Sequence, residues 1–105
     1  MLKAEYHYLS AKEAKKRIDS ESNIVVLDVR TKEEFNAEHI PLALNIPLNI
    51  VCDKVQELYE KDTILFIYCR SGVRSKVATS QLALMGYNNV FDFGGIIDWP
   101  FEKVK

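Results

Sequence analysis

The sequence is poor in the residues that break or cross-link a chain: its 105 residues include four glycines, three prolines and two cysteines. So little glycine and proline argues against a linker or a low-complexity segment. Two cysteines are too few for a disulfide framework, which favours a reducing, cytoplasmic setting. Because 48% of the residues are hydrophobic, the chain can bury a core of its own, and we expect one domain over residues 1–105.

The sequence also lacks an excess of one charge and any long hydrophobic run. Its basic and acidic residues nearly balance, the formal net charge is -1, and no long basic run occurs. A nucleic-acid partner is therefore not expected. No apolar stretch approaches the roughly 20 residues of a membrane span, so a membrane partner is not expected either. The first ten residues lack the apolar region of a secretory signal, and none is predicted.

What the sequence does contain is a regular alternation of strand-like and helix-like segments. Apolar runs rich in β-branched and aromatic residues predict strands, and helical spacing or capping boxes predict helices. The expected strands are 5–9, 23–29, 43–47, 63–69 and 89–93. The expected helices are 10–20, 31–37, 49–61 and 77–85, with Gly86 ending the last one and residues 94–105 forming a loop and a tail.

This alternation predicts an α/β domain with a parallel five-stranded sheet flanked by helices on both faces. In open parallel sheets, ligands bind at the carboxyl ends of the strands. Cys69 is the last residue of the predicted strand 63–69. We therefore expect the active site to include Cys69 and the segment that follows it.

Cys69 has two interpretations, which the segment YCRSGVRS, residues 68–75, helps to separate. A free cysteine at the end of a strand is often buried and inert. Here, however, Arg70 and Arg74 follow the thiol, together with Gly72, whose backbone can adopt conformations that other residues resist. These neighbours favour a catalytic cysteine.

Three features of this loop favour the thiolate of Cys69 over the thiol. The loop leads directly into a helix, whose first N–H groups are unpaired. The N–H groups of residues 70–75 can converge on one point as an anion-binding nest. Arg70 and Arg74 add positive charge. A thiolate in such a loop is a nucleophile suited to an anionic substrate.

The length of the loop separates two chemistries. Phosphatases typically carry Cys-x5-Arg, a loop wide enough for a tetrahedral phosphate, whereas Cys69 and Arg74 are spaced Cys-x4-Arg. Tyr68 stands before the cysteine, where a phosphatase would be expected to have histidine. The shorter loop is tight for phosphate, which counts against a phosphatase or arsenate reductase on the same fold, and these stay the alternative enzymes.

The sequence resembles the rhodanese-like sulfurtransferase family over nearly its whole length. The similarity is carried by three segments: LDVRTKEEFNAEHIPLALNIP at 27–47, YCRSGVRS at 68–75 and FGGIIDW at 93–99. Leu42 departs from the family, which commonly has glycine after His-Ile-Pro. This departure concerns the turn and leaves the active loop untouched. The resemblance implies a single rhodanese-like domain.

The resemblance also implies a catalytic cycle at Cys69. Its thiolate would take sulfane sulfur from a small anionic donor such as thiosulfate, hold it as a persulfide, and pass it to cyanide, a thiol or a protein cysteine. The residues implied to bind the substrate are those of the loop: Arg70, Ser71, Gly72, Val73, Arg74 and Ser75. Protein sulfur donors or acceptors fit the same cycle. The resemblance implies no metal and no organic cofactor.

Two further uses of such a domain stay open beside the enzyme. One is an interaction module without turnover, although an inactive copy commonly loses the cysteine that stands here at position 69. The other is a sulfur carrier in a relay. The chemistry at Cys69 would be the same in a relay and in detoxification, so the sequence does not separate them.

Residues outside the loop have simpler interpretations. Asp28 and Arg30 are expected to form a structural ion pair, and His39 is expected to hydrogen-bond the backbone. Cys52 is either an ordinary half-buried cysteine, which we favour, or a resolving thiol that attacks the Cys69 persulfide.

The remaining residues of interest concern two surfaces. The first helix carries a basic stripe, which we expect to be a solvated face in preference to a docking patch for an acidic partner. The stripe consists of Lys12, Lys15, Lys16 and Arg17. Gly94 and Gly95 allow a close approach of backbone and are expected to wall one side of the pocket, with Trp99 in the core or at its rim.

Overall fold

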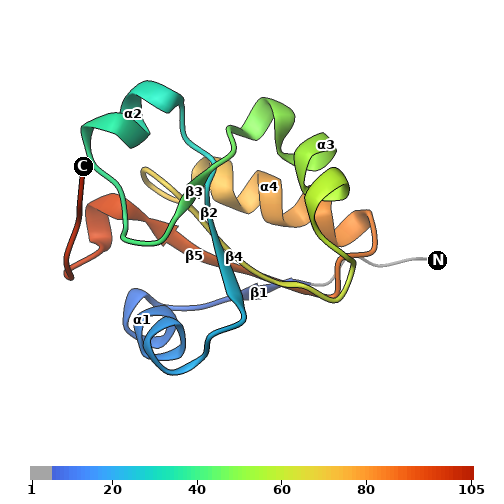
Figure 1. The fold of residues 1–105 in the computed structure, drawn as a ribbon, viewed down its shortest axis with the longest axis horizontal. Coiled ribbons are helices and arrows are strands. Elements are labelled where there is room, and N and C mark those ends of the chain that lie inside the picture. The colour runs from blue at the N-terminus through green and yellow to red at the C-terminus, as the bar shows by residue number, and fades with distance from the viewer. Residues whose placement is uncertain (1–5) are drawn as a thin grey trace.

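The computed structural model describes residues 6–105 and shows one parallel sheet (Figure 1). Its five strands run in the order β1-β5-β4-β2-β3, and every neighbouring pair is parallel. The strands are β1 (His7–Tyr8), β2 (Ile24–Asp28), β3 (Leu44–Asn45), β4 (Ile64–Cys69) and β5 (Asn89–Gly95). The predicted α/β class and five-stranded parallel sheet are confirmed. Part of the strand expected at 5–9 lies outside the described residues.

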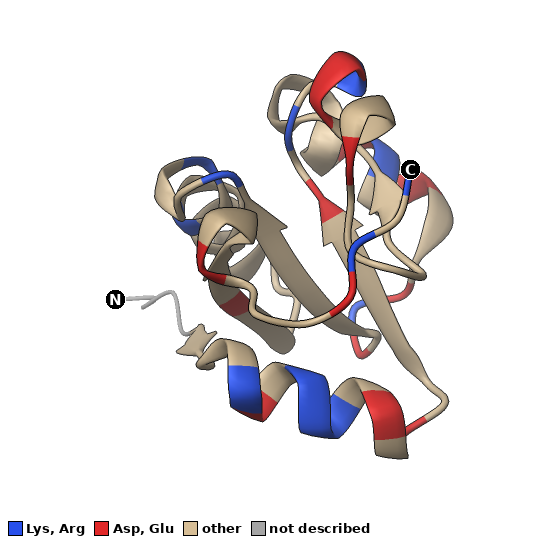
Figure 2. Cartoon of the chain, turned by 90° about the vertical axis from the view of Figure 1, so that its left-hand side faces the viewer, with Lys and Arg blue, Asp and Glu red and all other residues tan. Residues whose placement is uncertain are grey.

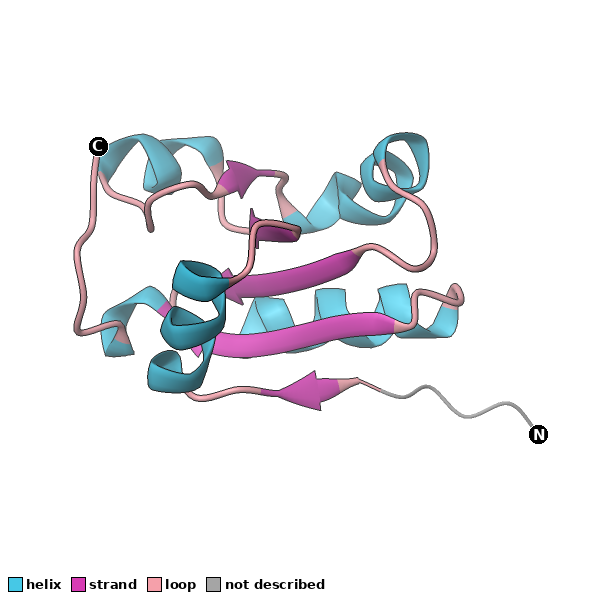
Figure 3. Cartoon of the chain, turned by 60° about the horizontal axis from the view of Figure 1, so that its bottom comes forward, coloured by secondary structure: helices cyan, strands magenta, loops and turns pink. Residues whose placement is uncertain are grey.

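Helices cover both faces of the sheet, as Figure 3 shows. They are α1 (Ala11–Ser20), α2 (Lys32–Ala37), α3 (Leu48–Leu58) and α4 (Val73–Leu84), followed by the 3-10 turn η1 (Ile96–Asp98). Capping boxes open α1 at Ser10 and α2 at Thr31, as predicted. Within residues 6–105 we find no helix with the length and apolar character of a membrane span.

The alternation of side chains along β4 divides the core into two clusters, one on each face. Leu65, Ile67 and Cys69 pack with residues of α3 and α4. Phe66 and Tyr68 pack on the opposite face, with α1 and the C-terminal segment. Because successive side chains of a strand point to opposite faces, the Cys69 thiol points toward α4.

Helix α4 begins earlier than predicted, at Val73 instead of position 77. Gly72 is the reason: it adopts the left-handed conformation, with φ of +104°, and so the chain turns into the helix after only three linking residues. The predicted end of this helix is confirmed. Gly86 is also left-handed, its N–H bonds to Ala83 O, and the Tyr87 N–H bonds to Leu82 O, which together form a Schellman motif.

Strand β5 is longer than predicted and includes Gly94 and Gly95, which the sequence placed in a loop. Glycine weakens a strand because it has no side chain to pack, so the sequence pattern pointed to a loop there. The structure nevertheless pairs Gly95 with Cys69, after a shift in register beyond Ile67. The last two residues of β5 therefore lie directly beside the cysteine.

The expected interactions of Asp28, Arg30 and His39 are confirmed. Arg30 Nη2 lies 2.7 Å from Asp28 Oδ2, and both side chains are buried. The same guanidinium donates to the Glu38 carbonyl, which ties β2 to the end of α2. His39 Nδ1 lies 2.9 Å from the Phe35 carbonyl oxygen, and its ring stacks on the Phe35 ring. These contacts fix the segment between β2 and β3.

Leu42 is the one non-glycine residue among the described positions with a left-handed backbone, at φ of +73°, and its side chain is 82% exposed. A left-handed residue with a Cβ is strained, while glycine is not. We expect Leu42→Gly to raise the free energy of unfolding by about 1 kcal/mol, because the relief of strain exceeds the added entropy of the unfolded chain. Urea unfolding measures this change.

The control for that variant is Leu84→Gly, at an exposed leucine in α4. It should lower the free energy of unfolding by about 1 kcal/mol, because glycine is a poor helix former. If Leu42→Gly destabilises the protein as much as Leu84→Gly does, the strain at Leu42 is not significant.

Candidate active site

Cys69 lies at the carboxyl end of β4, in the middle of the sheet, and is 1% exposed. The Gly72 N–H donates a hydrogen bond to its Sγ at 3.1 Å. The Cys69 thiol in turn donates to Ser75 Oγ at 3.6 Å. The loop therefore folds back over the sulfur, as expected for an anion-binding turn.

The loop is completed by the first turn of α4. Residues 70–72 link β4 to the helix, and Val73, Arg74 and Ser75 are its first three residues. The N–H groups at the start of a helix have no acceptor within it, and they carry partial positive charge. Six of the predicted site residues, 70–75, thus form one continuous turn around Cys69, but half of them belong to the helix.

β5 and η1 pack against this loop. The Ile97 N–H donates to the Arg70 carbonyl at 3.2 Å. Gly95 lies so close to the loop that a β-carbon there would be 2.6 Å from Ser71 Cα and would overlap the Arg70 carbonyl. The expected close approach at the glycine pair is therefore found at Gly95, and only glycine fits.

The two arginines of the loop differ, although the sequence suggested that both face the bound anion. Arg74 forms two hydrogen bonds with Glu34 of α2, at 2.7 and 3.0 Å. These bonds hold the pKa of Glu34 down at about 2, so the carboxylate stays charged. The Arg70 side chain is exposed and forms no ion pair with any described residue. Arg70 is therefore the loop arginine that is available to a ligand.

A groove of about 290 Å³ opens beside Arg74, next to the carboxyl end of β2 and the start of α3. Its lining combines backbone turns with apolar and polar side chains. The lining residues are Val29, Arg30, Thr31, Pro47, Leu48, Asn49 and Arg74. This groove lies at the carboxyl ends of the strands, where the sequence predicted the ligand site.

Asp92 is a site residue that the sequence analysis missed. It lies in β5, is 2% exposed, and its Oδ1 is 2.7 Å from Ser75 Oγ. The signal was a single acidic residue inside the apolar run NVFDF. Since charged residues are rarely buried without a partner, that residue could have been identified as one that faces a polar site.

Cys52 has the surroundings of an ordinary cysteine. It is half-buried in α3, and its thiol donates to Gln81 Oε1 at 3.5 Å. Burial, and to a smaller extent the charge of Asp53, raise the pKa of Cys52. A raised pKa leaves less thiolate, which counts against a resolving role.

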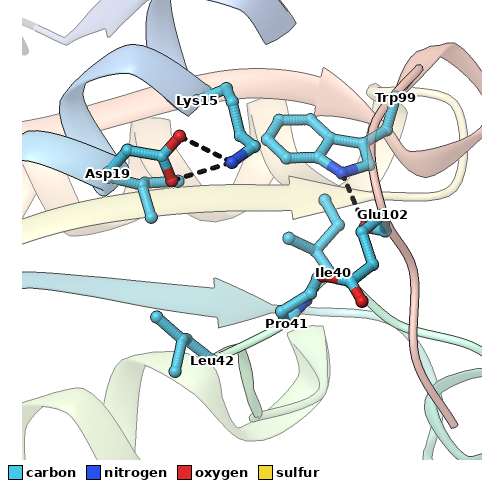
Figure 4. Close-up of a pocket in the computed structure, with 8 residues that line it drawn as sticks. Lys15, Asp19, Ile40, Pro41, Leu42, Trp99 and Glu102 are labelled. Atoms are coloured by element: carbon cyan, nitrogen blue, oxygen red, sulfur yellow. Dashed lines mark hydrogen bonds and ion pairs between the residues drawn. The ribbon is translucent and has the colours of Figure 1, made fainter.

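A second hollow, of about 160 Å³, lies on the other face of the sheet, between α1 and the turn at Leu42 (Figure 4). The Trp99 indole forms one wall and donates to the Glu102 carbonyl, while Lys15 pairs with Asp19 at the rim. No cysteine lines this hollow. It is therefore separate from the nucleophile, and Trp99 belongs to the core of this face.

The basic stripe of α1 is partly neutralised. Lys15 pairs with Asp19 and Arg17 pairs with Glu21, each four residues later. Figure 2 shows both basic and acidic positions along this helix. Lys12 and Lys16 are exposed. Lys15 and Arg17 are half-buried, and the Arg17 guanidinium lies over the rings of Phe66 and Phe91. The solvated face stays a prediction, since neither it nor a docking patch is tested by these contacts.

Comparison with known proteins identifies what this chain is similar to. The model of the rhodanese-like domain family matches residues 10–100. The chain is 36% identical to the thiosulfate sulfurtransferase PspE of Escherichia coli over 80 residues, covering 75% of this chain and 77% of that protein. It is also similar to a solved structure described as a rhodanese with anions from E. coli. The TM-score is 0.70, the identity is 34%, and the match covers 78% of this chain and 98% of that one.

Some relatives are longer than this chain. The putative sulfur carrier protein YrkF of Bacillus subtilis is 37% identical over 92 residues, which cover 87% of this chain but 49% of that protein. The chain thus spans about half the length of that relative. One of these two relatives is named as a sulfurtransferase and the other as a putative sulfur carrier.

Proposed function

The chain belongs to the rhodanese-like domain family, and we propose that it transfers sulfane sulfur from an anionic donor such as thiosulfate to cyanide or a thiol, through a persulfide on Cys69. The observation that carries this proposal is the position of the thiol. Cys69 is held at the end of β4, its Sγ accepts a hydrogen bond from the Gly72 N–H, and the loop leads directly into α4, whose first N–H groups have no acceptor within the helix. Such a turn stabilises an anion on or beside the sulfur.

In the first half-reaction, the Cys69 thiolate attacks the outer sulfur of the donor. The S–S bond of thiosulfate breaks, its electron pair leaves with sulfite, and the transferred sulfur remains on Cys69 as a persulfide. The negative charge on the terminal sulfur is then stabilised by the N–H groups of Val73, Arg74 and Ser75. The exposed guanidinium of Arg70 orients the incoming donor.

In the second half-reaction, a nucleophile attacks the terminal sulfur and Cys69 leaves as thiolate. The acceptor is cyanide, a small thiol or a protein cysteine, so the cycle is ping-pong. The protein supplies the nucleophile and the anion-binding loop, and we propose no metal or organic cofactor. Because relatives are named both as sulfurtransferases and as carriers, the same site suits turnover and relay.

Two observations favour sulfur over phosphate at this site. The link between β4 and α4 is only three residues long, which makes the loop tight for a tetrahedral phosphate. Arg74, which would clamp a phosphate in a wider loop, is already bound to Glu34 through both terminal nitrogens.

A reducing, cytoplasmic setting suits the proposed chemistry, since Cys52 and Cys69 are both free thiols.

The test is a direct comparison of the two chemistries on the same preparation. We expect thiosulfate with cyanide to give thiocyanate, and p-nitrophenyl phosphate to give no product above the background. Arsenate with a thiol reductant should likewise give no arsenite. Hydrolysis of p-nitrophenyl phosphate or reduction of arsenate, without thiocyanate formation, would instead identify a phosphatase or an arsenate reductase.

The two loop arginines should differ in their effect on donor binding. We expect Arg70→Ala to raise the KM for thiosulfate by about tenfold, because one charge-assisted contact is worth about 1.5 kcal/mol. Arg74→Ala should change that KM by less than about threefold, since its guanidinium is occupied by Glu34. Steady-state thiocyanate formation measures both values. The reverse order would mean that Arg74 leaves Glu34 when the donor binds.

A further inference from the structure

Asp92 is a buried carboxylate that the proposed reaction does not use. Its Oδ1 accepts hydrogen bonds from the Ser75 hydroxyl at 2.7 Å and from the Gly94 N–H at 3.0 Å. The second bond shapes the bend of β5 at Gly94, where φ is +90°. The first bond connects Asp92 to the site, because Ser75 lies directly beside the nucleophile. Asp92 therefore has one structural contact and one contact that leads to Cys69.

The hydrogen bonds around Ser75 determine what its hydroxyl presents to the sulfur. A serine hydroxyl has one proton to donate. Three acceptors surround Ser75 Oγ: Asp92 Oδ1 at 2.7 Å, the Gly72 carbonyl at 3.2 Å and the Gly94 carbonyl at 3.3 Å. The carboxylate is the nearest and carries charge, so it takes the proton. Toward Cys69, Ser75 then offers only a lone pair, which accepts from the thiol at 3.6 Å.

The groups that contact the Cys69 sulfur, and the charges behind them, consequently act on it in opposite directions. The Gly72 N–H, 3.1 Å from Sγ, favours negative charge on the sulfur. The Ser75 lone pair and the negative charge of Asp92 behind it favour the protonated thiol. Cys69, Ser75 and Asp92 are all buried, and in a buried region electrostatic effects are stronger than in water. The balance between thiol and thiolate at Cys69 therefore depends partly on Asp92 of β5.

We propose that Asp92, acting through Ser75, is a positioning residue that keeps negative charge off the Cys69 sulfur. It disfavours the thiolate of the empty site and thereby favours the persulfide once sulfur is bound. The second part rests on the proposed function. In the persulfide, the negative charge lies on the terminal sulfur instead of on Sγ. The charge is then farther from the Ser75–Asp92 pair by the length of one S–S bond. The carboxylate then opposes that charge less, while the N–H groups of the loop stabilise it.

The sulfur-release step shows how Asp92 affects the loaded state. A Cys69 persulfide anion and an acceptor thiol give the Cys69 thiolate and the persulfide of the acceptor. The bond from Sγ to the terminal sulfur breaks with its electron pair on Sγ, a new bond joins the terminal sulfur to the acceptor sulfur, and the acceptor's proton stays with the released persulfide. Because Asp92 disfavours the thiolate that this step produces, it shifts the equilibrium toward the loaded protein.

The test uses Asp92→Asn, which keeps an Oδ1 acceptor for Ser75 and Gly94 but removes the charge. We expect iodoacetamide to alkylate Cys69 about tenfold faster in this variant at neutral pH, as for removal of one nearby buried charge. The equilibrium between the loaded protein and glutathione should shift about tenfold toward the empty protein. Ser75→Ala, which removes the acceptor hydroxyl but keeps the charge, should accelerate alkylation less.

The matched control is Thr79→Val in the same helix. Thr79 is buried and its hydroxyl donates to the Ser75 carbonyl at 2.7 Å, but that bond does not lead to the sulfur. Alkylation of Cys69 should be unchanged in this variant, and alkylation of Cys52 should be unchanged in all of them.

Two results would overturn the proposal. Unchanged or slower alkylation of Cys69 in Asp92→Asn would leave Asp92 with a structural role at Gly94 alone. An equal acceleration in Thr79→Val, or at Cys52, would show that the helix had loosened instead. The alkylation experiment requires no sulfur donor, so it tests the effect of Asp92 even if the wild-type protein accepts no sulfur and the proposed function fails.

Discussion

Replacing Cys69 with serine is expected to abolish sulfur transfer and to leave the protein folded. The rate should fall by at least about a thousandfold, because loss of the nucleophile removes the covalent intermediate. Thiocyanate formation from thiosulfate and cyanide measures this loss. Since Cys69 is 1% exposed and serine is more polar, we also expect a loss of about 1–2 kcal/mol in the free energy of unfolding, measured in urea.

Cys52→Ser is the matched control for that variant, since it removes the other thiol of the chain. It should retain wild-type sulfur transfer, because Cys52 is bound to Gln81 and has a raised pKa. Activity that survives in Cys69→Ser and is lost in Cys52→Ser would assign the chemistry to the wrong cysteine. A persulfide that lasts longer in Cys52→Ser would restore the resolving role.

Gly95→Ala is expected to have the second largest effect, although the residue carries no chemical group. Its β-carbon would lie 2.6 Å from both the Arg70 carbonyl carbon and Ser71 Cα, which is well inside van der Waals contact. The active loop must then move away from β5. We expect kcat/KM to fall by about a hundredfold, because displacements near 1 Å cost that much in a positioned site. Steady-state kinetics and urea unfolding measure the effect.

The control for Gly95→Ala is Gly86→Ala, at the other end of α4. Gly86 is left-handed as well, but a β-carbon there meets only the Lys61 side chain, at 4.0 Å. This variant should lose about 1 kcal/mol of stability with unchanged sulfur transfer. If Gly95→Ala behaves like Gly86→Ala, with full activity, the contact between β5 and the loop is not needed for the site.

Local signals in the sequence predicted the fold well where they act within a few residues. The capping boxes at Ser10 and Thr31, and the glycine that ends α4, depend on hydrogen bonds between near neighbours. The apolar run that became β4 has six residues, too short for a buried helix, and placed Cys69 at a strand end. These features sufficed to locate the nucleophile.

The features that the sequence did not reveal lie where distant parts of the chain meet. Gly95 is part of a strand because Cys69 pairs with it, and glycine itself gives no strand signal. Arg74 turns to Glu34, which is 40 positions away, so its direction could not be read from the loop. Asp92 reaches the site through Ser75 across 17 positions. Each depends on tertiary contacts, which spacing within a segment does not reveal.

Intact mass spectrometry after incubation with thiosulfate tests most directly whether Cys69 carries sulfur. We predict that the wild-type protein gains the mass of one sulfur atom, that cyanide removes it, and that peptide mapping places it on the segment containing Cys69. Cys69→Ser should gain nothing. A folded wild-type protein that gains no sulfur from thiosulfate or from a persulfide donor would contradict the account and favour an interaction module.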